Sequence, residues 1–381
     1  EMGLFRDKNI VPVLMFHSVG LENYPWVWSH ISESFKSFES KISYLRQRGL
    51  NAITWNDLYN YMAGMKALPA DSILLTFDDG YLDNWVYVFP ILKRYGMKGT
   101  IFVNPEFVDP CETVRPNIEN VWSGESSMDD LQVAGFLNWE EMREMENSGI
   151  IDIQSHTLSH TWYFKGPKIE QFYFPAEVEE LPWLAWNARP DRKAFYLTED
   201  QSGFVTPGHP VFEHEKSLVV RRYFPSEDAV CAVTDYVKTC GGQEYFNSSV
   251  RITELQNWVS SQFGETGFPG TYETRDAQEE RIQSELADSK RLIEQQLDKG
   301  VDFVCWPGGG NDKNLQRHAL DAGYKSWTLS SRDQGNKRNI PGADPVSIKR
   351  IGTENRVEAR GCKYADGGAL YQWLRIAAHQ H

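Results

Sequence analysis

Two adjacent carboxylates end an apolar run in the first quarter of the chain. The stretch SILLTFDDGYLDNW, residues 72–85, places Asp78 and Asp79 directly after a β-branched, apolar segment. Neighbouring carboxylates repel each other and lose hydration when they are partly buried, so their proximity needs an offsetting interaction. A metal ion would provide one. The pair therefore predicts a metal site whose other ligands lie elsewhere in the sequence.

The other candidate ligands are two histidines in the stretch IDIQSHTLSH. His156 and His160 are four residues apart, and a helical turn after His156 would point both rings the same way. Two imidazoles and one carboxylate leave coordination positions open, which is typical of catalytic metal sites. Alone, Asp-Asp-Gly is usually a turn and such a histidine pair is usually structural. Their occurrence at successive strand ends favours the metal site.

The flanking sequence alternates between strand and helix patterns. Strands are predicted at 11–16, 72–77, 99–103, 151–156, 301–307 and 324–329, and helices at 35–49, 84–96 with a kink at Pro90, 138–149, 276–300 and 311–323. Such βα repeats predict a parallel sheet, open or closed into a barrel. Ligands of these folds bind at the carboxyl ends of the strands, where the candidate residues fall.

One segment breaks this alternation. Residues 164–275 are rich in Pro, Gly and aromatic residues, so we expect an insertion or subdomain over the cleft, between barrel segments 1–163 and 276–381. Helices are expected near 226–242 and 251–264. Its aromatic side chains either stack on sugar rings or pack the core of the subdomain; the candidates are Trp183, Trp186, Tyr196 and Phe204.

Composition narrows the class of protein. The chain has 381 residues, of which 41% are hydrophobic and 13% aromatic, with 13 Trp and 17 Tyr, enough for a large core and a weak indication of carbohydrate binding. The net charge of −14 and the lack of a dense Lys/Arg run argue against a nucleic-acid partner. No transmembrane segment and no signal peptide are visible, although the chain opens without Met. The five cysteines match no zinc motif and are read as scattered thiols.

Taken together, the motifs resemble those of a known family. TFDDG, SHTLSH, VPVLMFHSVG and YGMKGTIFV are similar to segments of the polysaccharide deacetylase family, also called the NodB-homology or carbohydrate esterase family 4 group. The resemblance covers roughly residues 10–163 and 276–350. It implies an α/β fold, a distorted (β/α) barrel of about seven parallel strands, and hydrolysis of acetyl groups from sugars.

By position, the resemblance assigns roles to the motif residues. It implies that Asp79, His156 and His160 bind a divalent metal, usually Zn²⁺, with Co²⁺, Ni²⁺ or Mn²⁺ as alternatives. Asp78 would be the general base, taking a proton from the attacking water. The backbone N–H of Tyr81 would help to stabilise the oxyanion.

The sequence departs from the family pattern in its third motif. VCWPGGGND places Cys305 where the family often has the Arg that orients the base, and Gly308 where it has an aromatic residue. This resembles the variant in deacetylases of poly-β-1,6-N-acetylglucosamine. Another group must then tune Asp78. Arg350 in SIKRIG is a candidate that would contact either substrate or Asp78, with an ordinary surface arginine as the equal alternative.

Three further positions complete the expected site. Trp306 either walls the substrate site or packs the core, and Pro307 fixes the backbone after its strand. The family's usual acid, a His in a late Leu-x-His motif, has no match, because His379 and His381 read as a tail. His17, at the end of the first strand, is the predicted acid; a structural, hydrogen-bonded histidine is the alternative.

These inferences predict a metal-dependent carbohydrate deacetylase that acts on N-acetylated amino sugars of a polysaccharide or oligosaccharide. An O-acetyl esterase on acetylated glycan is one alternative. A non-catalytic glycan-binding protein of the same fold is another, favoured by the missing Arg and the missing late His. Polysaccharide chemistry suggests the cell envelope or the exterior, with the cytoplasm as the alternative. The oligomeric state is left open.

Overall fold

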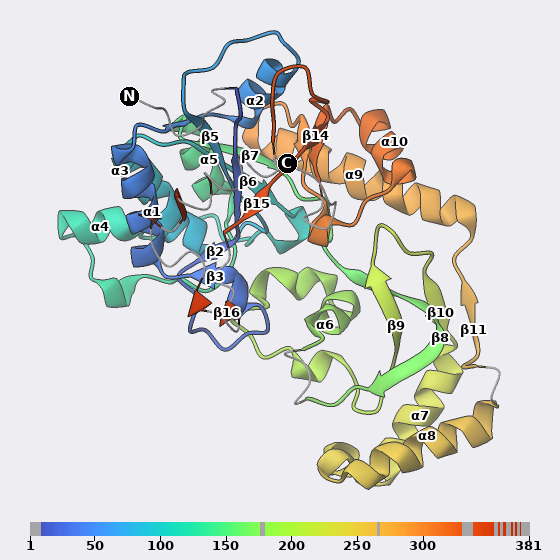
Figure 1. Cartoon of the computed structure of the whole chain (residues 1–381). Helices are drawn as coiled ribbons and strands as arrows, with labels where there is room; N and C mark the ends of the chain where they lie inside the picture. The colour runs from blue at the N-terminus through green and yellow to red at the C-terminus, as the bar shows by residue number, and fades with distance from the viewer. Residues whose placement is uncertain are drawn as a thin grey trace.

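A parallel β-sheet forms the centre of the molecule (Figure 1). The computed structural model describes residues 9–175, 180–264, 267–329 and 338–353, with five short pieces between 357 and 374. The strand order is β14-β13-β12-β7-β6-β5-β1-β15, and β4 also pairs with β5. The strands are β1 Val13–Phe16, β4 Asn51–Ala52, β5 Ser72–Phe77, β6 Gly99–Val103, β7 Ile151–Ser155, β12 Phe303–Val304, β13 Ser326–Thr328, β14 Ser347–Ile348 and β15 Ile351–Gly352.

One short segment closes this sheet into a distorted barrel. β14 pairs with β13 at one end of the strand order, and β15 pairs with β1 at the other end. Only Lys349 and Arg350 separate β14 from β15, so the same stretch of chain joins both edges. This closure confirms the predicted fold class, a distorted barrel of parallel strands.

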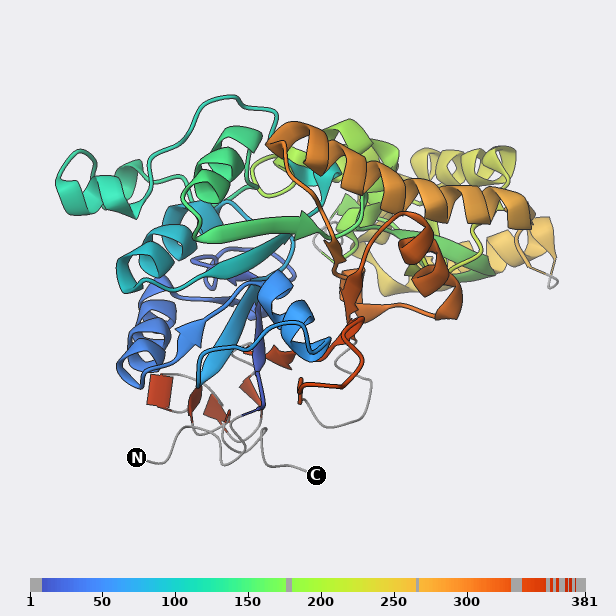
Figure 2. The ribbon, with the colours of Figure 1, turned by 90° about the horizontal axis from the view of Figure 1, so that it is seen from above.

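Apolar strands are buried because helices cover the outer face of the sheet (Figure 2). Every residue of β5 and β6 is buried, as expected for parallel strands that are covered on both faces. The covering helices are α1 Phe35–Gln47, α3 Phe89–Tyr95, α5 Trp139–Asn147, α9 Arg275–Leu297 and α10 Lys313–Asp321. Helix α2 Trp55–Met62 packs instead on the interior cluster of the barrel, and α4 Ile118–Ser123 lies at the periphery.

Local sequence signals fix where several of these helices begin. The Asn138 side chain accepts a hydrogen bond from the backbone of Glu141, whose carboxylate returns one to Asn138, closing a capping box at the start of α5. The Asp312 side chain caps the N-terminus of α10, the helix that the sequence predicted at 311–323. The predicted helices at 35–49, 138–149, 276–300 and 311–323 are therefore confirmed, with ends shifted by a few residues.

The helix predicted at 84–96 is present, but its first half is π-helical rather than α-helical. Asn84–Val88 form a π-helical turn, and α3 begins only at Phe89, with Pro90 in its first turn. Pro90 has no N–H to donate to the carbonyl four residues earlier, so the regular α-helical ladder cannot run through this point.

The chain between β7 and α9 builds a lobe beside the barrel (Figure 1). β8 Trp162–Phe172 pairs with β9 Pro210–Lys216, β10 Tyr223–Pro225 pairs with β11 Gly270–Tyr272, and the helices are α6 Pro182–Ala188, α7 Glu227–Thr239 and α8 Ser249–Phe263. The side chains of α7 and α8 share an apolar cluster with β9 and β10. The assignment of 164–275 as a separate insertion stays a prediction.

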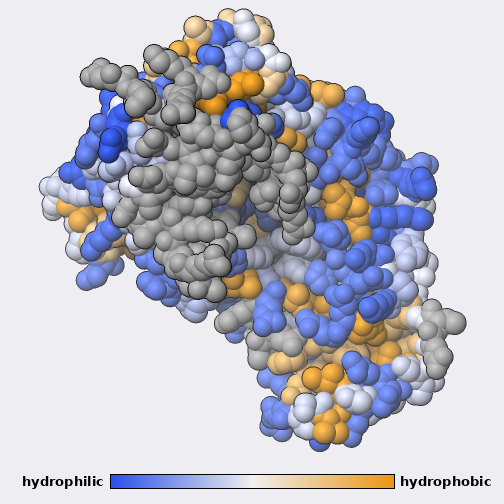
Figure 3. Space-filling model, in the orientation of Figure 1, coloured by the Kyte–Doolittle hydropathy of each residue, from blue (hydrophilic) through white to orange (hydrophobic). Residues whose placement is uncertain are grey.

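The molecular surface differs between the lobe and the barrel helices. Hydrophilic residues cover the face over α9 and α10, whereas apolar residues come to the surface at the α7–α8 end of the lobe (Figure 3). There Val250 of α8 is 62% exposed. Within the described residues, no helix combines the length and apolar character needed to cross a bilayer.

Candidate active site

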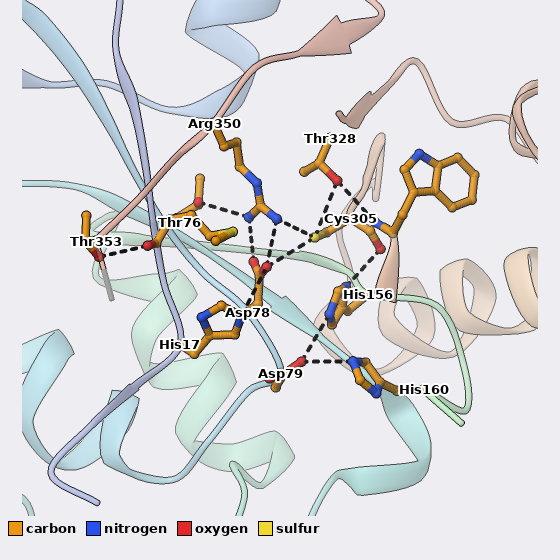
Figure 4. Close-up of polar contacts among 12 residues, drawn as sticks. His17, Thr76, Asp78, Asp79, His156, His160, Cys305, Thr328, Arg350 and Thr353 are labelled. Atoms are coloured by element: carbon orange, nitrogen blue, oxygen red, sulfur yellow. Dashed lines mark hydrogen bonds and ion pairs between the residues drawn. The ribbon is translucent and has the colours of Figure 1, made fainter. Parts of the chain in front are cut away.

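The residues singled out by the sequence meet at one end of the barrel (Figure 4). Because parallel strands end on the same side, the segments that follow β1, β5, β7 and β12 lie together there. They carry His17, Asp78, Asp79, His156, His160 and Cys305, while Arg350 reaches the same place from the break between β14 and β15.

Asp79, His156 and His160 form a compact group of oxygen and nitrogen donors. The Asp79 Oδ1 atom lies 3.1 Å from Nε2 of His156 and 3.3 Å from Nε2 of His160. The ligand atoms of the three residues all lie within 4.8 Å of one another, so they could hold a metal ion. One carboxylate and two imidazoles suit Zn²⁺ and related divalent ions, with positions left for water and substrate.

The surroundings of the two rings shift their pKa values in opposite directions. His156 Nδ1 lies 2.8 Å from the carbonyl of Cys305, which can only accept, so Nδ1 carries a proton and Nε2 is the nitrogen that faces Asp79. Burial lowers the pKa of His156, but Cys305 and the hydrogen bond with Asp79 outweigh it and raise this pKa well above its usual value, so a metal bound at Nε2 would displace a proton. Burial lowers the pKa of His160 to about 4, against the opposing charge of Asp79, so this ring is neutral at neutral pH. Burial raises the pKa of Asp79, but the two histidines outweigh it and hold this pKa far below its usual value.

The helical turn expected after His156 is wrong. Thr157 and His160 have left-handed backbones, with φ of 67° and 42°, and no helix follows β7. The two rings nevertheless lie side by side, with centroids 5.0 Å apart. Asp79 is also left-handed, with φ of 76°. A loop held in an uncommon conformation, rather than helical periodicity, brings the rings together.

Asp78 is held by a cation from the far end of the sequence. Arg350 donates from Nη1 to Oδ1 of Asp78 at 2.7 Å and from Nη2 to Oδ2 at 2.8 Å. Both side chains are buried. Burial raises the pKa of Asp78, but the charge and hydrogen bonds of Arg350 outweigh it and lower this pKa below its usual value. Of the roles left open for Arg350, the structure shows the contact with Asp78.

Cys305 occupies the space beside this ion pair. Its Sγ lies 3.4 Å from Oδ2 of Asp78 and 3.1 Å from Nη2 of Arg350. The thiol is much smaller than the arginine that the family often has here. The guanidinium of Arg350 therefore reaches the same carboxylate from another strand of the barrel.

His17 lies on the other side of Asp78. Its Nε2 is 3.9 Å from Oδ2 of Asp78, and its carbonyl accepts a hydrogen bond from Asn84 at 3.0 Å. The side chain is 15% exposed and lines the same cavity as Asp78. Its role as the acid stays a prediction. His379 and His381 lie outside the described residues.

A cavity of about 310 Å³ opens above these residues, and its walls are largely aromatic. The predicted site residues Tyr81, Trp306 and Arg350 line it, and Trp306 also belongs to the main core. The role of Trp306 in substrate binding stays a prediction. Pro307 is buried next to the wall that Gly308 and Gly309 form, and is not one of the described lining residues. Of the expected lobe aromatics, Trp186 and Tyr196 line the cavity, whereas Trp183 and Phe204 do not.

Two tryptophans of the cavity wall escaped the sequence analysis. Trp28 follows β2 (Ser18–Val19) and Trp162 opens β8, and their rings lie 6.2 Å apart and nearly parallel, at 17°. Trp162 also contacts the ring of His160 at 5.6 Å. The aromatic stretch YPWVWSH at 24–30 was the available signal, but it has no periodicity that assigns it to a site.

Part of the chain is similar to known polysaccharide deacetylases. Residues 65–180 match the family model "Polysaccharide deacetylase". YxkH of Bacillus subtilis, whose name assigns it to the polysaccharide deacetylases, is 31% identical over 150 residues, covering 39% of this chain and 43% of YxkH. The poly-β-1,6-N-acetyl-D-glucosamine N-deacetylase of Escherichia coli K12 is 27% identical over 121 residues, covering 32% of this chain and 17% of that protein.

Solved structures share the fold. A de-N-acetylase from Aggregatibacter actinomycetemcomitans superposes with a TM-score of 0.54 at 17% identity, covering 90% of this chain and 94% of that one. The BpsB deacetylase domain from Bordetella bronchiseptica gives a TM-score of 0.53 at 17% identity, covering 91% and 96%. The match to the family model over residues 65–180 and the shared fold confirm the resemblance to polysaccharide deacetylases. It spans less than half the length of the curated relatives it matches.

Proposed function

We propose that this protein hydrolyses acetyl groups from an acetylated carbohydrate, and that its preferred reaction is N-deacetylation of N-acetylated amino sugars in a polysaccharide. One observation carries the proposal. The Asp79, His156 and His160 donor set lies beside the Asp78–Arg350 pair at the base of an aromatic-walled cavity. A metal-dependent hydrolase of this kind uses two parts together, a site for a Lewis acid and a base held as its anion.

Asp79, His156 and His160 would hold a divalent cation, with Zn²⁺ favoured over Co²⁺, Ni²⁺ or Mn²⁺. A cation bound there supplies Lewis acidity, which polarises a carbonyl group and acidifies water. Asp78, kept anionic by Arg350, takes the proton of the water molecule that attacks the acetyl carbon.

The remaining steps fall to groups around Asp78. The backbone N–H of Tyr81 would donate to the oxyanion of the tetrahedral intermediate. Cleavage of the carbon–nitrogen bond releases acetate and an amine, and His17 would supply the proton that this amine needs to leave. The position of the His17 ring in the cavity, close to Asp78, supports this role.

The aromatic wall supports a sugar as the substrate. Trp28 and Trp162 are partly exposed above the donor set, and flat aromatic faces can stack on pyranose rings. The name of the Escherichia coli relative supports an amide, N-acetylglucosamine, over an ester. A polymeric glycan substrate in turn supports a location in the cell envelope or outside the cell.

Acetate release provides the test. Wild-type protein, with Zn²⁺ or Co²⁺ added, is assayed on β-1,6- and β-1,4-linked N-acetylglucosamine oligomers and on acetylated xylan. Asp78→Asn removes the base, and Asp129→Asn makes the same change at an exposed position as the matched control. We expect release from an N-acetylglucosamine oligomer that Asp78→Asn abolishes and Asp129→Asn preserves.

The other outcomes separate the alternatives. Release from acetylated xylan alone would make the protein an O-acetyl esterase. Retained metal without release from any of these substrates would contradict the proposed activity and favour a glycan-binding protein.

A further inference from the structure

The loop between His156 and His160 needs support from its surroundings. Thr157 and His160 both have positive φ, which residues with a Cβ rarely adopt and which persists only where neighbouring groups enforce it. Asn104 donates to the Thr157 carbonyl at 3.1 Å, and the Glu106 N–H donates to that of Leu158 at 3.3 Å. Successive carbonyl groups of the loop, those of Thr157 and Leu158, are thus each hydrogen-bonded to a different neighbour.

The strongest support comes from helix α9. The carboxylate of Glu285 uses both oxygens on one residue: it accepts the backbone N–H of Ser159 at 3.0 Å and also the Ser159 hydroxyl. One turn further along α9, the hydroxyl of Ser289 lies 2.8 Å from that of Ser155. A single face of α9 therefore fixes both the end of β7 and the residue before His160.

A lysine from the lobe holds Ser159 from the other direction. Lys193 lies in the 3₁₀ turn Pro190–Phe195, and its Nζ donates to the carbonyl of Ser159 at 2.9 Å. It also forms an ion pair with Glu106. The residue is only 2% exposed, and lysines are seldom buried this fully without such partners.

These contacts converge on the residue that directly precedes His160. We propose that Glu285 and Lys193 are positioning residues of the metal site: by clamping Ser159 they fix the His160 ring where it can bind metal. This inference rests on the proposed metal site of the deacetylase. Since Lys193 belongs to the segment 164–275, that segment sets the metal affinity as well as covering the cleft.

The test measures metal affinity, which does not depend on the substrate. Apparent dissociation constants for Zn²⁺ are measured by competition with a chelator for wild type, Glu285→Ala, Glu285→Gln and Lys193→Met. Visible absorption of the Co²⁺-loaded proteins reports ligand geometry, and urea unfolding of the metal-free proteins reports stability. Lys299→Met is the matched control, because Lys299, although less buried, also donates to a backbone carbonyl, that of Ile153, and pairs with Glu146 and Asp152.

We expect Glu285→Ala and Lys193→Met to weaken Zn²⁺ binding about 10- to 100-fold, the usual effect of losing groups that orient ligands. Their Co²⁺ spectra should change as well. Glu285→Gln should retain most of the affinity, since an amide can still accept from the Ser159 N–H and donate to its hydroxyl. Lys299→Met should lose stability but keep wild-type affinity and spectrum.

Two results would overturn the inference, and a third bears on the function. Unchanged affinity and an unchanged Co²⁺ spectrum in the folded Lys193→Met protein would show that the clamp is only structural, even if Glu285→Ala does not fold. Equal losses in Lys193→Met and Lys299→Met would assign the effect to stability. Absence of Zn²⁺ binding by the wild type would instead contradict the proposed metal site itself.

Discussion

Arg350 and Asp78 are 272 residues apart in the chain, yet the guanidinium donates two hydrogen bonds to the carboxylate at 2.7 and 2.8 Å. The arginine comes from the break between β14 and β15 and the aspartate from the end of β5. Paired, planar contacts of this kind fix the orientation of a carboxylate as well as its charge. The family resemblance places an arginine at position 305, where this chain has a cysteine. Arg350, from the break between β14 and β15, thus supplies the cation that would otherwise be absent beside Asp78.

Removal of this cation should disable the base. Arg350→Met leaves Asp78 buried without its partner, so we expect kcat/KM for acetate release to fall by about 100-fold, the scale of a displaced catalytic group. Unfolding in urea should show a loss of about 3–5 kcal/mol, typical of breaking a buried ion pair. Arg291→Met, which removes an exposed ion pair on α9, is the control. Wild-type turnover in Arg350→Met would contradict the assigned role.

Asp83 should make stability depend on pH. It is buried, and burial raises its pKa to about 7, although the hydroxyl of Ser18, the amide of Asn84 and the backbone N–H of Val19 donate to it. The folded protein therefore binds this proton more tightly than the unfolded chain does. The stabilisation is complete below about pH 4 and is lost as the pH rises to 7, by at most about 1.4 kcal/mol per pH unit.

The difference in free energy of unfolding between wild type and Asp83→Asn separates the contribution of Asp83 from those of other titratable groups. Free energies of unfolding in urea are measured for both proteins from pH 4 to pH 8. As the pH rises, the free energy of unfolding of Asp83→Asn should increase relative to that of the wild type. A difference that stays constant over this range would show that Asp83 titrates normally.

The tryptophan wall should contribute to substrate binding. Trp28→Ala removes a ring that packs against Trp162, Trp186 and Tyr196 above the donor set. We expect KM for N-acetylglucosamine oligomers to rise about tenfold, equivalent to about 1.4 kcal/mol. Trp122→Ala removes a tryptophan that is 41% exposed on α4, and should leave KM unchanged. Equal KM values for both variants would remove Trp28 from the binding site.

Metal removal should destabilise the wild type more than a variant of the donor set. Since only the folded chain presents the three donors together, Zn²⁺ at 100 times its dissociation constant adds about 2.7 kcal/mol of stability. Chelation should therefore lower the melting temperature of the wild type and leave that of His160→Ala almost unchanged. The same shift in both proteins would place the bound metal elsewhere.

The sequence predicted the parts of the site that short motifs encode. Asp78 and Asp79 follow a strand that five consecutive apolar or β-branched residues define, and His156 follows another, so their position at one end of a parallel sheet could be inferred. The loop conformation could not, because left-handed φ values at Thr157 and His160 depend on tertiary contacts.

Long-range partners lay beyond sequence reasoning. Arg350 had three possible roles because no local pattern says which carboxylate it faces. Glu285 and Lys193 look like ordinary charged residues of a helix and a loop, and only the folded chain brings both to Ser159. Trp28 and Trp162 are likewise far apart in sequence and meet only across the cavity.

The segment that closes the barrel, β14 and β15, also links closure of the barrel to completion of the site. Arg350 reaches Asp78 only when Ser347–Ile348 has joined β13 and Ile351–Gly352 has joined β1. Every other group of the site belongs to residues that precede this segment. A chain without this segment in place would hold the donor set and the carboxylate but would lack the cation, so the proposed hydrolysis would depend on closure of the barrel.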